Sequence, residues 1–227
     1  MFGANSQEKA YLAPFLVFMA LLALGQLVHA LFEGQAWWVV ATPRYWIFPL
    51  QTLVCGLLLA YGWKHYELTR PAQPLFTTAI AVLVLAIWIA PQELLGAERR
   101  WEGFDPGFFG GGAAYGTNVG VRFIRLVIVV PLLEEIFWRG FLLRYLIKDD
   151  FTQVPFGTFS WTSFGVVTLF FGLAHMGPDF WPAIITGALY NFVAYRTRSL
   201  ASCVLAHAIT NLLLGIYILR TGQWGFW

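Results

Sequence analysis

Long apolar runs separated by short polar segments dominate the chain. Seven of these runs are long enough, or nearly so, to cross a hydrocarbon core of about 30 Å as helices, which takes roughly 20 residues. They cover residues 11–32, 45–63, 75–90, 118–147, 158–174, 180–195 and 200–220. The pattern therefore predicts an all-α fold, a polytopic membrane helical bundle with about seven to eight transmembrane helices.

The composition supports a location in a membrane. Hydrophobic residues make up 59% of the 227 residues and charged residues only 11%, whereas soluble domains carry about 25% charged residues. The net charge is only +2 and there is no run of lysine or arginine, so we expect no nucleic-acid partner. Cys55 and Cys203 both lie in apolar runs, and we expect buried thiols rather than a disulfide framework.

Polar residues gather between the third run and the start of the fourth. Residues 92–116 hold six charged side chains and the glycine run 110–112. Such a segment is typical of a mobile loop, and two interpretations stay open: a solvated connection, or a lid over one face. Arg122 and Arg125 follow at the start of the fourth run, where we expect their side chains to reach out to lipid head groups.

The fourth run carries the candidate chemistry. Residues 127–143 read VIVVPLLEEIFWRGFLL and include Glu134, Glu135 and Arg139. Each charge near the middle of a bilayer costs about 2.5–3.5 kcal/mol on insertion scales. Residues four apart share a helix face, so Glu135 and Arg139 can neutralise each other. Glu134 lies about 100° round the helix, where Trp138 cannot neutralise it, so Glu134 needs water or a partner from another helix.

Two later runs offer such partners. Phe171 and His175 lie one turn apart at the end of the fifth run, and His207 and Asn211 lie one turn apart in the seventh. Ionisable groups inside a membrane usually face the interior of the bundle and pair there. We therefore expect Glu134, His175, His207 and Asn211 to surround one cavity.

The position of His175 predicts an unusual fifth helix. In a full-length upright helix, His175 would lie at the wrong depth to meet the histidine of the seventh run. Gly177 and Pro178 follow directly and stop the helix. We expect this helix to start outside the core and to end near mid-membrane, which is permitted where the backbone lines a wet cavity.

Three motifs follow one another along these runs. They are E-E-x-x-x-R, F-x-x-x-H and H-x-x-x-N, formed by Glu134, Glu135 and Arg139, by Phe171 and His175, and by His207 and Asn211. In this order they resemble the CAAX protease and bacteriocin-processing family of intramembrane proteases. The segment EEIFWRGFLLR and the ending TGQWGFW are similar to the bacterial branch of that family found alongside exosortase systems. We expect a single domain over residues 1–227, with its motif core at residues 118–220.

The resemblance implies a metal-independent glutamic endopeptidase without a covalent intermediate or a cofactor. Glu134 with His175 would activate a water that attacks the scissile carbonyl. His207 and Asn211 would donate hydrogen bonds to the developing oxyanion. The supporting residues would be Glu135, Arg139 and Phe171. The substrate would be a membrane-associated protein or peptide, including lipidated ones, and the location a bacterial cytoplasmic membrane.

Three other functions fit the same residues. Two histidines and two glutamates could bind zinc, although the helical zinc-protease signature with two histidines four residues apart around a glutamate is missing. A membrane scaffold or immunity factor could keep the fold without catalysis. A proton-coupled transporter could use a Glu/His relay, but the chain shows no internal repeat of the kind that transporters often carry.

Overall fold

The computed structural model describes residues 6–227 and contains helices but no strand within them. Four segments are long and apolar enough to cross a membrane. They are α1 (Ser6–Leu31), α3 (Arg44–Gly62) with the 3-10 turn η1 (Trp63–His65), α4 (Pro74–Glu93) and α10 (Leu200–Thr221). The prediction of an all-α membrane bundle is confirmed.

Three further helical segments complete the bundle. The fourth apolar run forms one continuous rod, in which π-helical turns separate three α-helical pieces. In chain order, the rod consists of α5 (Ala113–Phe123), the π turn η2 (Ile124–Val129), α6 (Val130–Glu135), the π turn η3 (Ile136–Leu142) and α7 (Leu143–Tyr145). α8 (Trp161–Leu173) and α9 (Phe180–Thr197) follow as a hairpin. Short helices in the connections are α2 (Trp38–Ala41), η4 (Phe151–Gln153) and η5 (Gly177–Asp179), and η6 (Trp224–Phe226) follows α10.

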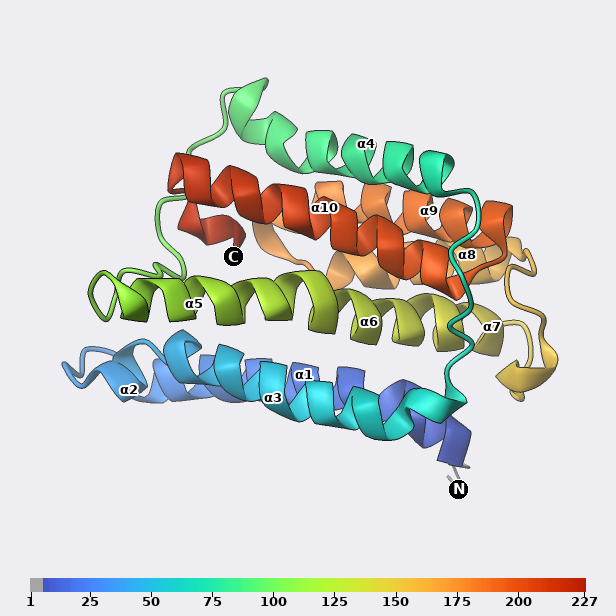
Figure 1. Ribbon diagram of the computed structural model, residues 1–227, viewed down its shortest axis with the longest axis horizontal. Helices are drawn as coiled ribbons and strands as arrows, with labels where there is room; N and C mark the ends of the chain where they lie inside the picture. Colours follow the sequence, from blue (N-terminus) through green and yellow to red (C-terminus); the bar gives the residue numbers. More distant parts are fainter. Residues whose placement is uncertain (1–5) are drawn as a thin grey trace.

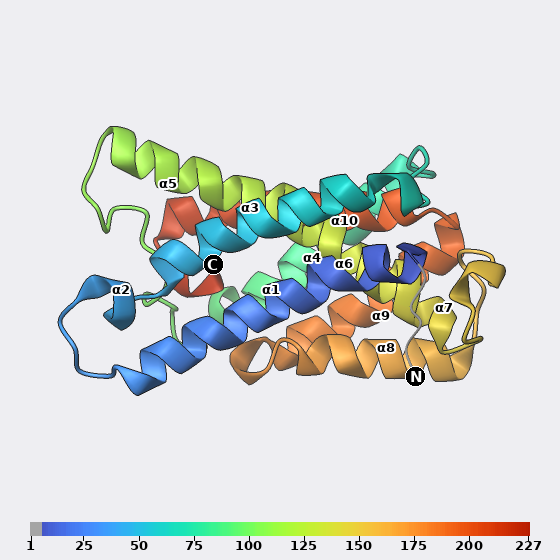
Figure 2. The same cartoon turned by 90° about the horizontal axis from the view of Figure 1, so that it is seen from below.

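The rod occupies the centre of the bundle. Figure 1 shows it between the α1 and α3 pair on one side and α4, α9 and α10 on the other, and Figure 2 shows α8 beside the end of the rod. α1, α3 and α10 each contact it. Residues of the rod can therefore face helices from both ends of the sequence.

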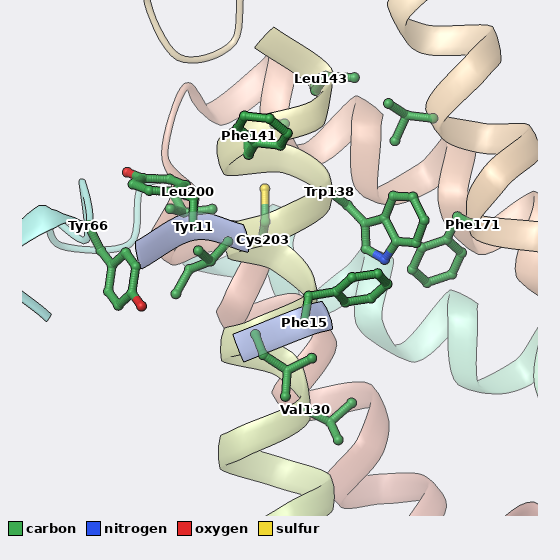
Figure 3. Packing of buried hydrophobic residues seen from close by; sticks show 14 of the residues in the cluster. Tyr11, Phe15, Tyr66, Val130, Trp138, Phe141, Leu143, Phe171, Leu200 and Cys203 are labelled. Atoms are coloured by element: carbon green, nitrogen blue, oxygen red, sulfur yellow. The ribbon is translucent and has the colours of Figure 1, made fainter. Parts of the chain in front are cut away.

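Aromatic packing fixes α1 and α8 against the rod. Phe15 of α1 stacks on Phe137 with ring centroids 3.9 Å apart, and meets Trp138 edge-on at 5.2 Å. Trp138 in turn meets Phe171 of α8 at 5.7 Å, as Figure 3 shows. A Cβ atom on Gly140 would come within 2.8 Å of the Tyr11 ring, so the close approach of α1 depends on this glycine. This cluster holds Phe171, and hence the end of α8, close to the helix that carries the two glutamates.

α8 is a short helix that ends before Gly177 and Pro178, as the sequence predicts. Its 13 residues correspond to about 20 Å of helix, less than the core thickness of about 30 Å. The Ser160 hydroxyl caps its start by accepting the Ser163 N–H. The helix ends at Leu173, and η5 follows with Pro178 in its first turn. His175 therefore lies in a turn between two helices.

The sequence predicted a loop over residues 92–116, but the connection between α4 and the rod is shorter. Gln92 and Glu93 belong to α4, and α5 already begins at Ala113. The Asp105 backbone N–H donates to the Tyr45 hydroxyl of α3 at 3.1 Å. The Arg100 carbonyl accepts the Gly225 N–H at 2.9 Å. These bonds tie the connection to α3 and to the C-terminal segment. Both interpretations of it, a plain connection and a lid, stay open.

Candidate active site

A cavity of about 270 Å³ lies inside the bundle. Its walls come from α1, α4, the rod, the turn after α8, α9, α10 and the C-terminal segment. The four residues expected to be catalytic all line it: Glu134, His175, His207 and Asn211. The structure thus brings together side chains that are up to 77 residues apart in the sequence. Their catalytic roles stay a prediction.

Glu134 presents a free carboxylate oxygen. The residue is only 7% exposed, and its buried Oε2 atom has no hydrogen-bond partner among the described residues. No ion pair is formed by Glu134 within residues 6–227 either. A buried carboxylate without a protein partner is costly unless water or a ligand meets it. Glu134 therefore lines the cavity with a carboxylate that no ion pair within the described residues neutralises.

Glu135 is, by contrast, held in a fully buried network. Its Oε1 atom accepts a hydrogen bond from Arg139 Nη1 at 3.0 Å, so the ion pair predicted from the helical spacing is present. The same oxygen lies 2.9 Å from His207 Nδ1. Arg139 also donates to the Asn191 side chain and to the Gly187 carbonyl, both at 3.1 Å. The spacing of the residues gave no sign of the contact with His207, because it joins two different helices.

The contact with Glu135 decides what His207 can do. An ionised carboxylate only accepts hydrogen bonds, so Nδ1 of His207 carries a proton that points to Glu135. In the neutral ring, Nε2 is then an acceptor. A donor role toward an oxyanion therefore requires His207 to hold a proton on both nitrogens.

His175 is oriented by the end of α8. Its Nδ1 lies 2.9 Å from the carbonyl oxygen of Phe171, which can only accept, so Nδ1 carries the proton and Nε2 of the neutral ring keeps its lone pair. The Phe171 ring lies 4.7 Å from the imidazole and the Trp88 ring 6.0 Å from it. Phe171 thus packs beside His175 as expected, and His175 can accept a proton at Nε2.

Asn211 is anchored to the π turn of the rod. Its Nδ2 donates to the Leu126 carbonyl at 2.9 Å. A π turn displaces carbonyls from the regular i to i+4 pattern and is common at functional sites. Gly215 lets α10 come this close, since a Cβ atom there would lie 2.9 Å from the Phe123 ring. The amide has a second N–H, which this hydrogen bond does not use. Asn211 can therefore donate to a ligand while the bond to Leu126 holds its side chain in place.

Arg122 and Arg125 also line the cavity, and the expectation that they reach out to lipid head groups is wrong. They are only 2% and 7% exposed. Arg125 donates through Nε and Nη2 to Gln51 Oε1 at 3.2 and 2.9 Å. The Phe48 ring lies 4.4 Å from each guanidinium carbon. The π turn η2, which no feature of the sequence marked, contributes Arg125 to the cavity wall.

The cavity does not gather a set of metal ligands. Within residues 6–227, no three His, Cys, Asp or Glu side chains come together in a metal-binding arrangement. One of the two glutamates is occupied by Arg139 and His207. The zinc alternative therefore has no ligand set in this part of the chain.

A comparison with known families confirms the resemblance carried by the three motifs. Residues 116–213 match the family model described as type II CAAX prenyl endopeptidase, Rce1-like. This segment is 98 of the 227 residues and is similar to the CAAX protease family. All the motif residues fall inside the matched segment. No curated protein and no solved structure matches the chain.

The similarity of residues 116–213 to the CAAX protease family supports a peptidase that acts on a membrane-associated protein. Together with the four apolar helices, this similarity supports an integral membrane protein. Two of these helices, α1 and α4, lie outside the matched segment yet contribute Phe15 and Trp88 to the cavity. The residues before position 116 therefore help to build the space in which a CAAX-protease-like site lies.

Proposed function

We propose that the chain is a metal-independent glutamic endopeptidase in which Glu134 and His175 activate a water molecule. The observation that carries this proposal is the contrast between two adjacent carboxylates. Oε1 of Glu135 is used by Arg139 and His207, although its Oε2 has no partner, and Glu135 is not among the residues that line the cavity. Glu134 forms no ion pair within the described residues and lines the same cavity as His175. A structural ion pair with Arg139 requires only one of the two adjacent glutamates, and Glu135 forms it.

The proposed reaction uses the side chains as they stand in the cavity. A water between Glu134 and His175 gives a proton to this pair while its oxygen bonds to the scissile carbonyl carbon. The carbonyl oxygen becomes an oxyanion, which accepts hydrogen bonds from Asn211 Nδ2 and from a doubly protonated His207. The C–N bond then breaks, and the proton held by Glu134 or His175 passes to the leaving nitrogen. Atoms and charge balance without a covalent enzyme intermediate.

We propose a lipidated protein as the substrate and a bacterial cytoplasmic membrane as the location. The wall that α1 contributes to the cavity is apolar and is formed by Phe15, Phe18, Met19 and Leu22. Such a wall suits a hydrocarbon chain attached near the scissile bond. The family description names prenyl substrates, and the resemblance to the bacterial branch supports the location. Because helices on both sides of residue 116 line the cavity, we also propose that residues 1–227 form one domain.

The test is a hydrolysis assay on the full-length chain in phosphatidylcholine vesicles. The probe is a peptide with S-farnesyl-cysteine followed by three apolar residues and a free carboxylate. We expect Glu134→Gln to abolish cleavage while its unfolding midpoint stays close to that of the parent chain. The control is Glu33→Gln, which removes an exposed carboxylate outside the cavity and should cleave normally.

The opposite results decide against the proposal. Cleavage by Glu134→Gln at the parent rate would show that another group activates the water. A Glu134→Gln variant that inserts normally and keeps the biological effect of the chain in cells would favour the scaffold or immunity role over the peptidase.

A further inference from the structure

His175 lies in a turn and not in a helix, so its position depends on what holds that turn. Residues 174–179 connect α8 to α9 and contain Gly177, which has a positive φ of 84°. In the proposed reaction, His175 must stand at a fixed distance from Glu134. A misplacement of about 1 Å in such a pair can lower the rate about 100-fold. The contacts of this turn therefore bear on the chemistry.

One ion pair anchors the turn from another segment. Arg100, in the connection between α4 and the rod, donates from Nη1 to Asp179 Oδ1 at 2.6 Å. The two side chains are only 11% and 26% exposed, so water screens the pair incompletely. Within residues 6–227, no other hydrogen bond joins residues 174–179 to a segment outside α8 and α9. The Trp88 ring also contacts His175, but such packing fixes a position less sharply than a charged hydrogen bond does.

Arg100 is itself held by the C-terminal segment, residues 222–227. Its backbone N–H donates to Gln223 Oε1 at 3.2 Å, and its carbonyl accepts the Gly225 N–H at 2.9 Å. Its guanidinium carbon lies 4.3 Å from the Phe226 ring. A Cβ atom on Gly225 would come within 2.7 Å of the Arg100 Cβ, so the two backbones run in close contact here. Arg100 is therefore a fixed point to which Asp179 can be tied.

The neighbouring arginine forms a pair of the same kind in a different place. Arg99 donates through Nη1 and Nη2 to the carboxylate of Glu93, at 2.8 and 3.3 Å. Neither of these two residues lines the cavity, and their side chains are about one third exposed. Asp179, by contrast, lines the cavity together with His175. Two adjacent arginines thus each hold a carboxylate, but only the pair of Arg100 reaches the turn that carries the histidine.

We propose that Arg100 and Asp179 are positioning residues that hold His175 at its working distance from Glu134. The proposal rests on the proposed function, in which Glu134 and His175 activate water. Asp179 acts through the turn, because its carboxylate is bound to Arg100. Arg100 lies outside residues 116–213, which match the family model. The connection between α4 and the rod therefore sets the geometry of a site whose motif residues all lie elsewhere.

The test measures kcat and KM separately for cleavage of the farnesylated peptide by the full-length chain in phosphatidylcholine vesicles. Arg100→Gln and Asp179→Asn should each lower kcat by about tenfold or more, while KM stays within about twofold, because only the alignment for water activation is lost. Arg100→Lys keeps a positive charge facing Asp179 and should recover most of kcat. The matched control Arg99→Gln removes the adjacent ion pair and should keep the parent kcat. The double variant of Arg100→Gln and Asp179→Asn should be no slower than either single variant, since both remove the same anchor.

A second measurement follows the turn without any substrate. Hydrogen–deuterium exchange reports local opening of the backbone. Amides of residues 174–179 should exchange faster in Arg100→Gln and Asp179→Asn than in the parent chain, and at the parent rate in Arg99→Gln. Exchange in α10 should stay unchanged in all three variants. This combination separates a released turn from a general loss of structure, which would speed exchange in every helix.

Several results would overturn the proposal. A parent-like kcat in Arg100→Gln, or an equal loss in Arg99→Gln, contradicts a positioning role. Loss of kcat in Asp179→Asn alone would mean that Asp179 acts on the substrate directly. Faster exchange throughout the bundle would assign the pair to the fold. Cleavage that depends on Glu134 but is unaffected in both variants refutes this inference alone; cleavage that survives Glu134→Gln, while both variants lose kcat, refutes only the proposed function.

Discussion

The Nδ1 atom of His207 lies 2.9 Å from the Oε1 atom of Glu135, although the two residues are 72 positions apart. The same oxygen accepts the hydrogen bond of Arg139. One carboxylate therefore joins α10 to the rod and fixes the direction of the His207 ring. Glu135 acts as a positioning residue for the cavity, while its neighbour Glu134 stays free for the reaction that we propose.

Replacing Glu135 should damage the fold far more than replacing Glu134. Glu135→Ala leaves Arg139 buried without its counter-charge, and breaking a buried pair in this way costs about 3–5 kcal/mol. Glu134→Ala removes a side chain whose buried oxygen has no protein partner, and should change the free energy of unfolding by less than about 1 kcal/mol. Denaturant unfolding of both variants in detergent measures the difference. Equal losses would show that Glu134 also holds the fold together.

Arg139 should not tolerate lysine. The guanidinium donates from three nitrogens to Glu135, Asn191 and Gly187, and its carbon lies 4.8 Å from the Phe171 ring. A single ammonium cannot span these separated acceptors. We expect Arg139→Lys to lose about 1.5–3 kcal/mol of stability, the worth of charged hydrogen bonds. The control Arg220→Lys is exposed and should unfold like the parent. If both variants unfold alike, the network contributes little.

The elements of this site that depend on local spacing could be predicted from the sequence. The pair of Glu135 and Arg139 follows from a separation of four residues in a helix, and the structure confirms it. The end of α8 follows from Gly177 and Pro178, which stop the helix. Both features are decided within a few neighbouring residues, where helical geometry leaves little choice.

Contacts between distant segments could not be predicted in the same way. The bond from His207 to Glu135 depends on how α10 rotates against the rod, and the anchor of Asn211 on the Leu126 carbonyl depends on a π turn. Neither rotation nor π turn leaves a periodic signal in an apolar run. Arg122 and Arg125 were placed wrongly for this reason, since a default rule for arginines near a membrane surface ignores the cavity beside them.

Removal of metal ions should leave hydrolysis unchanged. Within residues 6–227 no three potential ligand side chains converge, and Glu135 is already neutralised by Arg139. We therefore expect the rate of cleavage of the farnesylated peptide to stay the same after dialysis against a strong chelator. Loss of activity that is restored by added Zn²⁺, but not by Mg²⁺, would revive the zinc alternative and contradict the glutamate mechanism.

Asn211 should contribute to the rate more than to the fold. Asn211→Ala removes one hydrogen bond to Leu126 and one proposed donor to the oxyanion, and loss of such a donor lowers kcat by about 10²–10³-fold in other hydrolases. Asn118→Ala is the matched control, because Asn118 also donates its side-chain amide to a carbonyl at 2.9 Å, that of Pro106, but lies outside the cavity. The two variants should lose similar stability, about 1 kcal/mol, yet only Asn211→Ala should lose kcat. A parallel fall of kcat in both would mean that Asn211 merely holds α10 against the rod.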